Sequence, residues 1–429
     1  MMGKKATVLS VLSACLVILI LVGCAPSGQA GQGAKAPAEE KVLKLGCIMP
    51  FTGPAGLWGA SIKPGMDIYA QLINEDGGVK VGNDTYKIEM YYADGFEPAM
   101  SATAARSLIY DKKVNALVGV LSMGNAPVTQ VSSPEKVIAN LGSIGGRDAL
   151  PPDQSYAIYG YPSMEAAMNF ALAIMEGFPQ YHNICWAGPE TGVKEAHTYA
   201  QPVDDRLKKD FGITSTRCYY PAGTTNFTPY ITKMAEQGVE VVYLLAGVLD
   251  ICMFAKQRTQ MGYKWPLLQM SAPLDYDTLR GIVGSDEAMQ NLVVDYPVPW
   301  EFKKVTVAPK YLDMAKRIWA KYKETYNKDM FIGAFGGTSI TSMGQYLEAV
   351  QQAGTVDPDA VMRTIRAGTF DSFMGRYTTS GKTTDYGSNV CYGYPCCLGV
   401  LKGKKFEYLS EHPLMDVEHP FVPASSASQ

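Results

Sequence analysis

Histidine is scarce in this chain, and neither the histidines nor the cysteines are spaced to form a metal site. The four histidines are His182, His197, His412 and His419, and the nine cysteines contain no Cys-x-x-Cys pair. A Gly-x-Ser-x-Gly nucleophile elbow is also absent. Gly381-Lys382-Thr383 lacks the upstream glycine spacing of a phosphate-binding loop. We therefore expect no metal, no cofactor and no enzymatic activity.

A basic excess and a second long apolar run are missing as well. The chain carries 38 basic and 41 acidic residues, whereas nucleic-acid-binding proteins usually carry a marked positive charge. Beyond the N-terminal segment no stretch is long and apolar enough for a polytopic membrane protein. The apolar content of 47% argues against disorder. A length of 429 residues suits two globular domains better than one.

The cysteine count does not fit a disulfide scaffold. Apart from Cys15 and Cys24, seven cysteines remain, and an odd number leaves at least one free thiol unless a bond forms between chains. Cys185 lies in an apolar run and is most simply a core residue. It could form a bridge with Cys218 if their two strands are neighbours.

The N-terminus reads as a targeting segment. Lys4 and Lys5 precede an apolar run from 8 to 22, which is short for a spanning helix and typical of a secretory signal. The run ends in small residues before Cys24, which resembles the lipobox of bacterial lipoproteins; an ordinary signal peptide is the alternative. We expect a signal peptide over 1–23 and a lipidated, flexible tether over 24–42. The protein would then be extracytoplasmic and lipid-anchored to the cell membrane.

After the tether, short strand-like runs alternate with amphipathic helical runs. The expected strands are 44–49, 86–92, 114–120, 137–141, 184–187, 213–220 and 239–245. Helices are expected from about Pro64, from Pro98, after Ser163, from Thr228-Pro229 and from Asp357-Pro358. This alternation, with crossovers of about a dozen residues, predicts parallel sheets flanked by helices.

An ordered set of short motifs resembles one known family. The motifs are Ile48 to Pro54 with Trp58-Gly59, Leu72 to Val79, Tyr92 to Asp94, Val118 to Ser122, Pro221 to Phe227, and Phe370-Asp371 with Met374-Gly375. Together they are similar to the periplasmic binding proteins of type I, and most of all to the branched-chain amino-acid-binding proteins of ABC importers. The resemblance covers roughly residues 42–405.

The resemblance implies an α/β fold of two Rossmann-like lobes with parallel sheets, joined by three hinge crossovers. We expect lobe one over 43–160 and 297–369, lobe two over 161–296 and 370–410, and a C-terminal tail over 411–429. The crossovers would lie near 161–162, 296–297 and 370, where hinge residues absorb the change in backbone angles as the lobes close. We also expect a monomer.

The loop after the strand ending at Val120 is the first candidate binding segment. Ligands bind outside the carboxyl ends of parallel strands. Pro127 suits a first helical position, so the amides before it would be free for an anion. Ser122 and the amides of Met123, Gly124 and Asn125 are thus candidates to hold a carboxylate, which the family's carboxylate loop at this place supports. A plain capping loop is the alternative.

Further candidates in lobe one follow from the resemblance. Gly145, Gly146 and Arg147 align with the family's second ligand loop, where glycine allows close approach of the backbone and Arg147 could clamp a carboxylate. Arg147 could equally be a surface residue. Trp58 occupies the position of an aromatic at the mouth of the family's ligand site, and it has no obvious core partner in its glycine-flanked loop.

The lobe-two candidates lie at matching strand ends and crossovers: Tyr161, Trp186, Thr191, Gly247, Asp250, Ser271 and Tyr296. Here the sequence departs from the amino-acid binders. Thr191 replaces their tyrosine, and the segment around Ser271 lacks the acid that holds the ligand ammonium. Asp250 could substitute, although it could simply be an N-cap. Because burying an ammonium without a carboxylate is costly, this departure favours a simple organic acid over a zwitterion.

Taken together, these patterns predict the extracytoplasmic receptor of an ABC importer. Such a receptor captures a small organic carboxylate or amino-acid-like solute between two lobes and delivers it to a permease with a cytoplasmic ATPase. A sensory ligand-binding module that signals to a membrane partner is the alternative, because it needs the same site.

Overall fold

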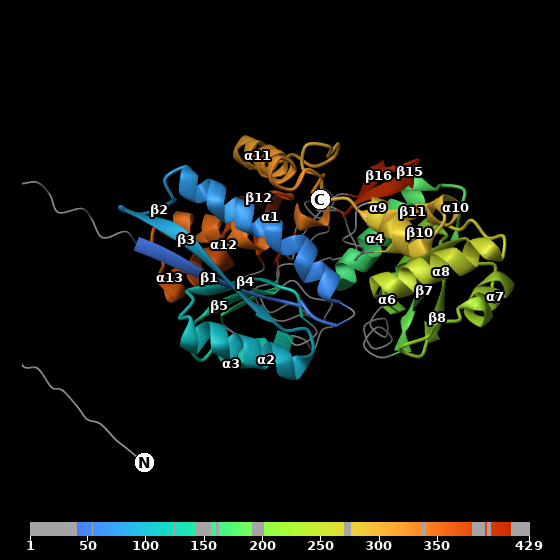
Figure 1. The fold of residues 1–429 in the computed structure, drawn as a ribbon, viewed down its shortest axis with the longest axis horizontal. Coiled ribbons are helices and arrows are strands. Elements are labelled where there is room, and N and C mark those ends of the chain that lie inside the picture. Colours follow the sequence, from blue (N-terminus) through green and yellow to red (C-terminus); the bar gives the residue numbers. More distant parts are fainter. Residues whose placement is uncertain are drawn as a thin grey trace, which may run out of the picture. The chain divides into compact units, whose positions relative to one another are not determined.

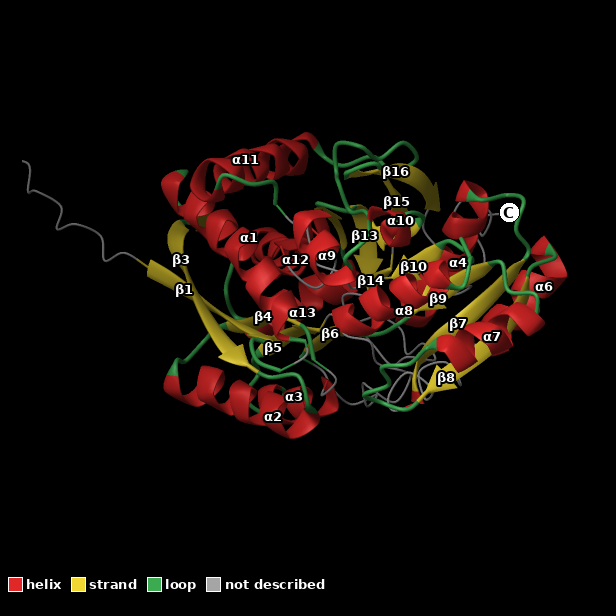
Figure 2. Cartoon of the chain, turned by 45° about the vertical axis from the view of Figure 1, so that its right-hand side comes forward, coloured by secondary structure: helices red, strands yellow, loops and turns green. Residues whose placement is uncertain are grey.

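The computed structural model describes residues 41–53, 55–122, 125–141, 156–159, 163–190, 201–269, 276–330, 332–335, 340–379, 391–392 and 396–412. Its strands form a six-stranded, a seven-stranded and a three-stranded sheet, which we call sheets A, B and C. Figures 1 and 2 show sheets A and B as separate bodies, each with its own helices.

Sheet A has the strand order β2-β3-β1-β4-β5-β6. Its strands are β1 (Lys41–Met49), β2 (Val79–Val81), β3 (Asp84–Asp94), β4 (Ala116–Val120), β5 (Ile138–Leu141) and β6 (Ala157–Tyr159). All neighbours are parallel except the β2–β3 hairpin. Strands β1, β4 and β5 are almost continuously buried, as expected for a parallel sheet that is covered on both faces.

Helices cover both faces of sheet A (Figure 1). One apolar cluster joins β1 to α1 (Gly56–Glu75) and α12 (Ile340–Ala353). A second cluster joins the opposite face to α2 (Pro98–Arg106), the π-helical turn η1 (Ser107–Asp111) and α3 (Asn125–Ser132). Helix α11 (Pro309–Tyr326) packs on α1, and α13 (Pro358–Ala367) packs on α12. We call sheet A with these helices lobe one.

Sheet B has the order β16-β15-β11-β10-β9-β7-β8. The parallel strands are β7 (Asn183–Pro189), β8 (Thr214–Tyr220), β9 (Val241–Leu244), β10 (Leu267–Gln269) and β11 (Leu292–Asp295), and the antiparallel edge is β15 (Cys396–Lys402) with β16 (Lys405–His412). Helices α4 (Ser163–Gly177), α6 (Gln201–Phe211), α7 (Thr228–Glu236), α8 (Val248–Gln260), α9 (Tyr276–Val283) and α10 (Asp286–Met289) accompany it. We call this body lobe two.

Three connections link these bodies. The chain passes from β6 of sheet A to α4, from β11 of sheet B to α11, and through sheet C to β15. Sheet C consists of β12 (Thr369–Ser372), β13 (Gly375–Thr379) and β14 (Cys391–Tyr392), and the 3-10 helix η3 (Ile332–Phe335) precedes α12. The two-lobe α/β class predicted from the sequence is therefore confirmed, while the residue limits of the lobes stay a prediction.

One sequence-based expectation was wrong, and one possibility that was left open is decided by the structure. Helix α1 begins at Gly56 rather than near Pro64, which lies in its interior. Cys185 and Cys218 lie on adjacent strands but remain free thiols, as do Cys47 and Cys252. All four side chains are buried, in agreement with cysteine acting as a small apolar residue.

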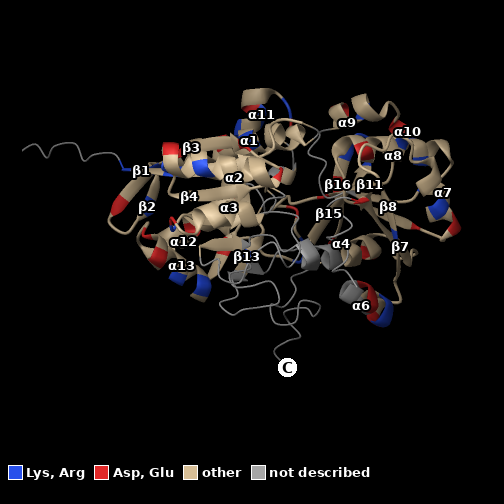
Figure 3. Cartoon of the chain, turned by 90° about the horizontal axis from the view of Figure 1, so that it is seen from below, with Lys and Arg blue, Asp and Glu red and all other residues tan. Residues whose placement is uncertain are grey.

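Charged residues of both signs are intermixed on the outer helices, for example on α6, α11 and α13 (Figure 3). Among the described helices, none is both long enough and apolar enough to span a bilayer. Within the same residues, no group of three or more histidine, cysteine, aspartate or glutamate side chains is arranged to hold a metal.

Candidate ligand-binding site

The carboxyl ends of β1, β3 and β4 bring three loops together at one edge of sheet A. These strands are parallel and adjacent, so residues 50–53, 95–97 and 121–122 follow the same edge. Ligands of open parallel sheets bind at this edge. Three sequence-predicted site residues, Trp58, Ser122 and Asn125, lie here.

Trp58 is placed by a tight turn into α1. The amide of Gly59 donates to the carbonyl oxygen of Pro50 at 3.1 Å, and the amide of Trp58 donates to the carbonyl of Ala55 at 3.0 Å. A Cβ atom on Gly59 would lie 2.1 Å from that Pro50 oxygen, so only glycine permits this approach. The Trp58 side chain is 7% exposed and belongs to the apolar cluster that joins β1, α1 and α12. The expectation of a loop residue without a core partner was therefore wrong.

Asp94 fixes the same turn from the end of β3. Its carboxylate accepts hydrogen bonds from the amide of Phe51 at 2.8 Å and from the hydroxyl of Thr52 at 2.5 Å. The amide hydrogen bond from Phe51, followed by the Thr52 hydroxyl, lowers the pKa of Asp94 below its usual value. Sequence reasoning identified this residue only as part of a family motif.

Phe96 connects Trp58 to the loop after β4. The Trp58 and Phe96 rings meet edge to face with centroids 5.7 Å apart. The hydroxyl of Ser122 donates to the carbonyl of Phe96 at 3.2 Å and lies 2.5 Å from the hydroxyl of Ser101. Asn125 is the first residue of α3 and is 2% exposed. Pro127 is the third residue of that helix rather than the first, because α3 begins two residues earlier.

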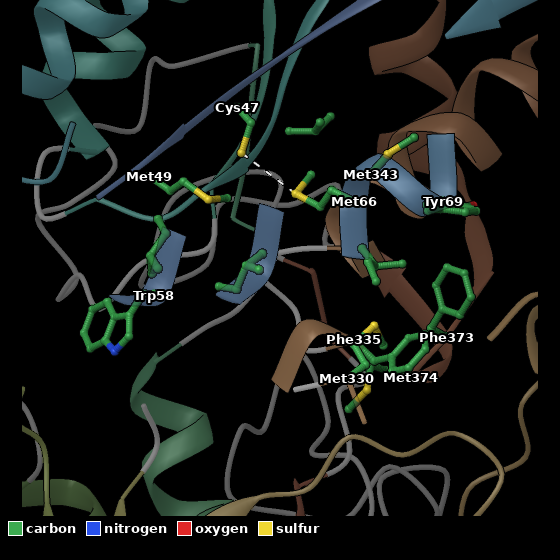
Figure 4. Close-up of a cluster of buried hydrophobic side chains, with 14 of the residues drawn as sticks. Cys47, Met49, Trp58, Met66, Tyr69, Met330, Phe335, Met343, Phe373 and Met374 are labelled. Atoms are coloured by element: carbon green, nitrogen blue, oxygen red, sulfur yellow. Dashed lines mark hydrogen bonds between the residues drawn. The ribbon is translucent and has the colours of Figure 1, made fainter. Parts of the chain in front are cut away.

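The Trp58 indole nitrogen lacks an acceptor among the described residues. Its atom is buried, and no hydrogen-bond partner for it lies in the part of the chain that the structure describes. Figure 4 shows the ring nitrogen on the side facing away from Met49 and Cys47. A buried donor of this kind costs free energy unless an acceptor reaches it.

Several predicted residues lie outside the described part of the chain. They are Cys24, Met123, Gly124, Gly145, Gly146, Arg147, Tyr161, Thr191 and Ser271. Their assignments stay predictions.

The described lobe-two candidates occupy different environments. Trp186 is fully buried in the core beside α4, and its indole nitrogen donates to Asp204 at 3.0 Å. We therefore read it as a core residue and do not carry it into the site. The ring of Tyr296 is also buried, and its hydroxyl donates to Glu301 at 3.0 Å.

Gly247 and Asp250 do lie at the carboxyl edge of sheet B, where α8 begins. The N-cap of α8 is Gly247, so the N-cap reading of Asp250 was wrong. Asp250 lies in the first turn and accepts a hydrogen bond from the Tyr220 hydroxyl at 3.0 Å. Burial raises the pKa of Asp250, and the Tyr220 hydrogen bond opposes that rise.

Sequence reasoning missed Asp295, the last residue of β11. It follows three buried apolar residues, Leu292, Val293 and Val294, at the same edge of sheet B. A single acid ending an apolar run, directly before the Tyr296-Pro297 crossover, is the signal that could have revealed it.

A two-lobe α/β fold with aromatic and polar side chains gathered at the carboxyl ends of its strands defines a class of solute-binding proteins. The family model for periplasmic binding proteins matches residues 42–390. The chain belongs to this family, whose members are extracytoplasmic binding proteins rather than enzymes.

Relatives with assigned names support the family at low identity. A Leu/Ile/Val-binding protein homolog 7 of Brucella abortus is 24% identical over 352 residues, which are 78% of this chain and 83% of that protein. A Leu/Ile/Val-binding protein homolog 6 of Brucella suis is 24% identical over 257 residues, or 56% of this chain. The match spans only 60% of the length of homolog 6.

Solved structures share the fold. The branched-chain amino acid transporter substrate binding protein LivJ of Streptococcus pneumoniae, in complex with isoleucine, has a TM-score of 0.65 at 17% identity and covers 87% of this chain and 100% of its own. A solute binding protein of an ABC transporter from Rhodopseudomonas palustris, in complex with benzoate, has a TM-score of 0.62 at 16% identity. The match covers 88% of this chain and 98% of that protein. At such identities these likenesses establish the fold only.

Proposed function

We propose that the protein is the receptor of an ABC importer, held at the outer face of the cell membrane by lipid on Cys24. It captures a small organic carboxylate or an amino-acid-like solute between its lobes and delivers it to a permease with a cytoplasmic ATPase. The observation that supports this best is the cluster of Trp58, Phe96, Ser122 and Asn125 at the carboxyl edge of sheet A, with an indole donor that lacks an acceptor among the residues that the structure describes.

In this proposal lobe one holds the solute carboxylate. The loop from Ser122 to Asn125 leads into α3, and amides before a helix favour an anion. Gly145, Gly146 and Arg147 would complete this half of the site. Tyr161, Thr191, Gly247, Asp250 and Ser271 would line lobe two.

The relatives leave two solute types open. The Brucella proteins are named as Leu/Ile/Val-binding homologs, and the structural neighbours hold isoleucine or benzoate. Both solute types carry a carboxylate, so the shared group is the one to test first.

A thermal-shift screen of the full chain in mild detergent tests the proposal. Amino acids, aromatic acids and branched short-chain acids should raise the melting temperature, because a solute at about 100 times its Kd stabilises the fold by about 2.7 kcal/mol. The matched control is 3-methylbutylamine, which has the leucine skeleton without its carboxylate and should have no effect. If no carboxylate shifts the melting temperature, the proposal is wrong.

A sensory role is the second candidate, since it uses the same solute site. A permease and an ATPase that co-purify with the protein would favour transport.

A further inference from the structure

Asp295 lies where lobe two should meet a solute. It ends β11, whose neighbour β10 runs parallel to it and also ends at this edge of sheet B. Across β11, Asp295 pairs with Leu398 of the antiparallel strand β15. The next residues form the crossover that leads to α11. The side chain is partly exposed, so it is within reach of solvent.

The Asp295 carboxylate lacks a side-chain partner among the described residues. Asp250 and Glu348 each accept a hydrogen bond from a tyrosine hydroxyl at 3.0 Å, from Tyr220 and Tyr311 respectively, whereas the buried Glu411 accepts from the backbone amides of Lys303 and Lys304. The charged and titratable groups that interact with Asp295 are the Tyr243 hydroxyl from β9 and the Cys396 and Cys397 thiols from β15. None of these is a cation.

This setting makes the charge of Asp295 unfavourable. Burial raises the pKa of Asp295 to about 7, and a hydrogen bond from the amide of Tyr296 only partly opposes the rise. A hydrogen-bond donor or a cation brought by a solute would stabilise the ionised carboxylate. Perturbed acids of this kind cluster at functional sites.

We propose that Asp295 determines solute specificity: it accepts a hydrogen bond from an ammonium or hydroxyl group of the bound solute. This inference rests on the proposed function and narrows it. The solute is then a carboxylic acid with a second, hydrogen-bond-donating group, and not a plain hydrocarbon carboxylate. The expectation that a simple organic acid is preferred arose because no acid stands at the family's ammonium-binding position around Ser271, although Asp275 is close in the sequence. Asp295 offers an acid from the next strand.

Lobe one offers the complementary group. The Trp58 indole N–H is a donor without an acceptor among the described residues, and Asp295 is an acceptor that receives the Tyr296 amide but no side-chain donor from those residues. A solute that carries both a carboxylate oxygen and an N–H or O–H donor satisfies both. A plain carboxylate accepts from the Trp58 indole N–H but offers no donor to Asp295, and leaving Asp295 without a donor from the solute costs free energy.

The test compares three solutes that share one skeleton: leucine, 2-hydroxy-4-methylpentanoate and 4-methylpentanoate. Phenylalanine, 3-phenyllactate and 3-phenylpropanoate form a second set. Calorimetry on the full chain should show at least tenfold tighter binding of one donor-bearing solute than of the plain carboxylate in its set. The ammonium and hydroxyl members identify which donor Asp295 accepts.

Asp295→Asn should remove this preference. If the donor is an ammonium, its affinity should fall at least tenfold in the variant, and if it is a hydroxyl the loss should be about threefold. The affinity of the plain carboxylate should stay equal or increase. Asp277→Asn is the matched control, because Asp277 is an exposed acid on α9 of the same lobe. It should leave every affinity unchanged.

A second measurement holds even if the variant folds poorly. In the wild-type protein, binding of an ammonium solute should strengthen from pH 6 to pH 8 as Asp295 ionises. The Cys396, Cys397 and Tyr243 groups stay neutral over this range because burial raises the pKa of each.

Equal affinities for all three solutes, or tightest binding of the plain carboxylate, would overturn the inference while leaving the proposed function intact. If no solute binds at all, the proposed function fails with it.

Discussion

At the scale of single residues, Gly59 has the clearest part in building the site. Alanine at this position would force its Cβ against the Pro50 carbonyl oxygen, 2.1 Å away, and against the Phe51 ring. We expect Gly59→Ala to lower the free energy of unfolding by about 2 kcal/mol or more and to weaken solute binding, because the turn that presents Trp58 must move. Chemical denaturation and calorimetry measure the two effects.

The control for this substitution is a glycine in open space. Gly281 lies in α9, and a Cβ there meets nothing within 4 Å. Alanine has the better helix propensity, so Gly281→Ala should be neutral or stabilise by up to about 1 kcal/mol. Equal losses for both variants would show that Gly59 matters only through general glycine effects.

Asp94 gives a residue-scale prediction with a defined pH dependence. The Phe51 amide and the Thr52 hydroxyl lower its folded-state pKa below the usual 3.8. The stabilisation is therefore complete above pH 3.8 and is lost as the pH falls through the lower folded value. Asp94→Asn should destabilise by about 1 kcal/mol at pH 7, and this difference from wild type should shrink below pH 4. A difference that stays constant down to pH 2 would contradict the assignment.

At the scale of helices and strands, local signals predicted most element positions. Pro98 and Thr228-Pro229 open α2 and α7, and Asp357 caps α13 by accepting from the amide of Ala360 at 2.9 Å. Buried β-branched runs gave the central strands, such as β4 and β9. These signals act within one or two turns of the chain, so the sequence alone carries them.

The start of α1 could not be read locally. Proline usually marks a first helical turn, yet Pro64 lies inside α1, and the turn that starts the helix depends on contacts with Pro50 and Asp94. The site residues show the same limit, because a position that depends on tertiary packing cannot be recognised from local sequence signals. Ser122 and Asn125 were found because they follow a strand end, and Trp58 because it occupies a position of the family resemblance. The core position of Trp186 depends instead on which face of β7 lies under α4. Asp295 was missed because β11 shows no motif.

At the scale of the whole molecule, the crossover from β11 to α11 is held at both ends. Buried Glu411 of β16 accepts hydrogen bonds from the amides of Lys303 at 2.7 Å and Lys304 at 3.1 Å. Glu176 of α4 pairs with the Lys304 ammonium at 2.7 Å. At the other end, Glu348 of α12 holds α11 through Tyr311. We expect rotation of one lobe against the other to concentrate in the backbone between these contacts, at residues 305–308, and not at the crossover position near 296–297 that the sequence suggested.

Removing the Glu411 carboxylate tests whether its hydrogen bonds to Lys303 and Lys304 confine the rotation to residues 305–308. Glu411→Ala leaves two amides without their acceptor, so we expect a loss of about 2 kcal/mol in the free energy of unfolding. Amide hydrogen exchange should increase over 299–304 as this part of the crossover is released. Glu407→Ala is the matched control on the same strand, because the Glu407 side chain is 56% exposed and lies 3.9 Å from Lys402. A weak surface pair should change stability by less than about 0.5 kcal/mol. If the two variants behave alike, Glu411 does not anchor the crossover, and the rotation need not be confined to 305–308.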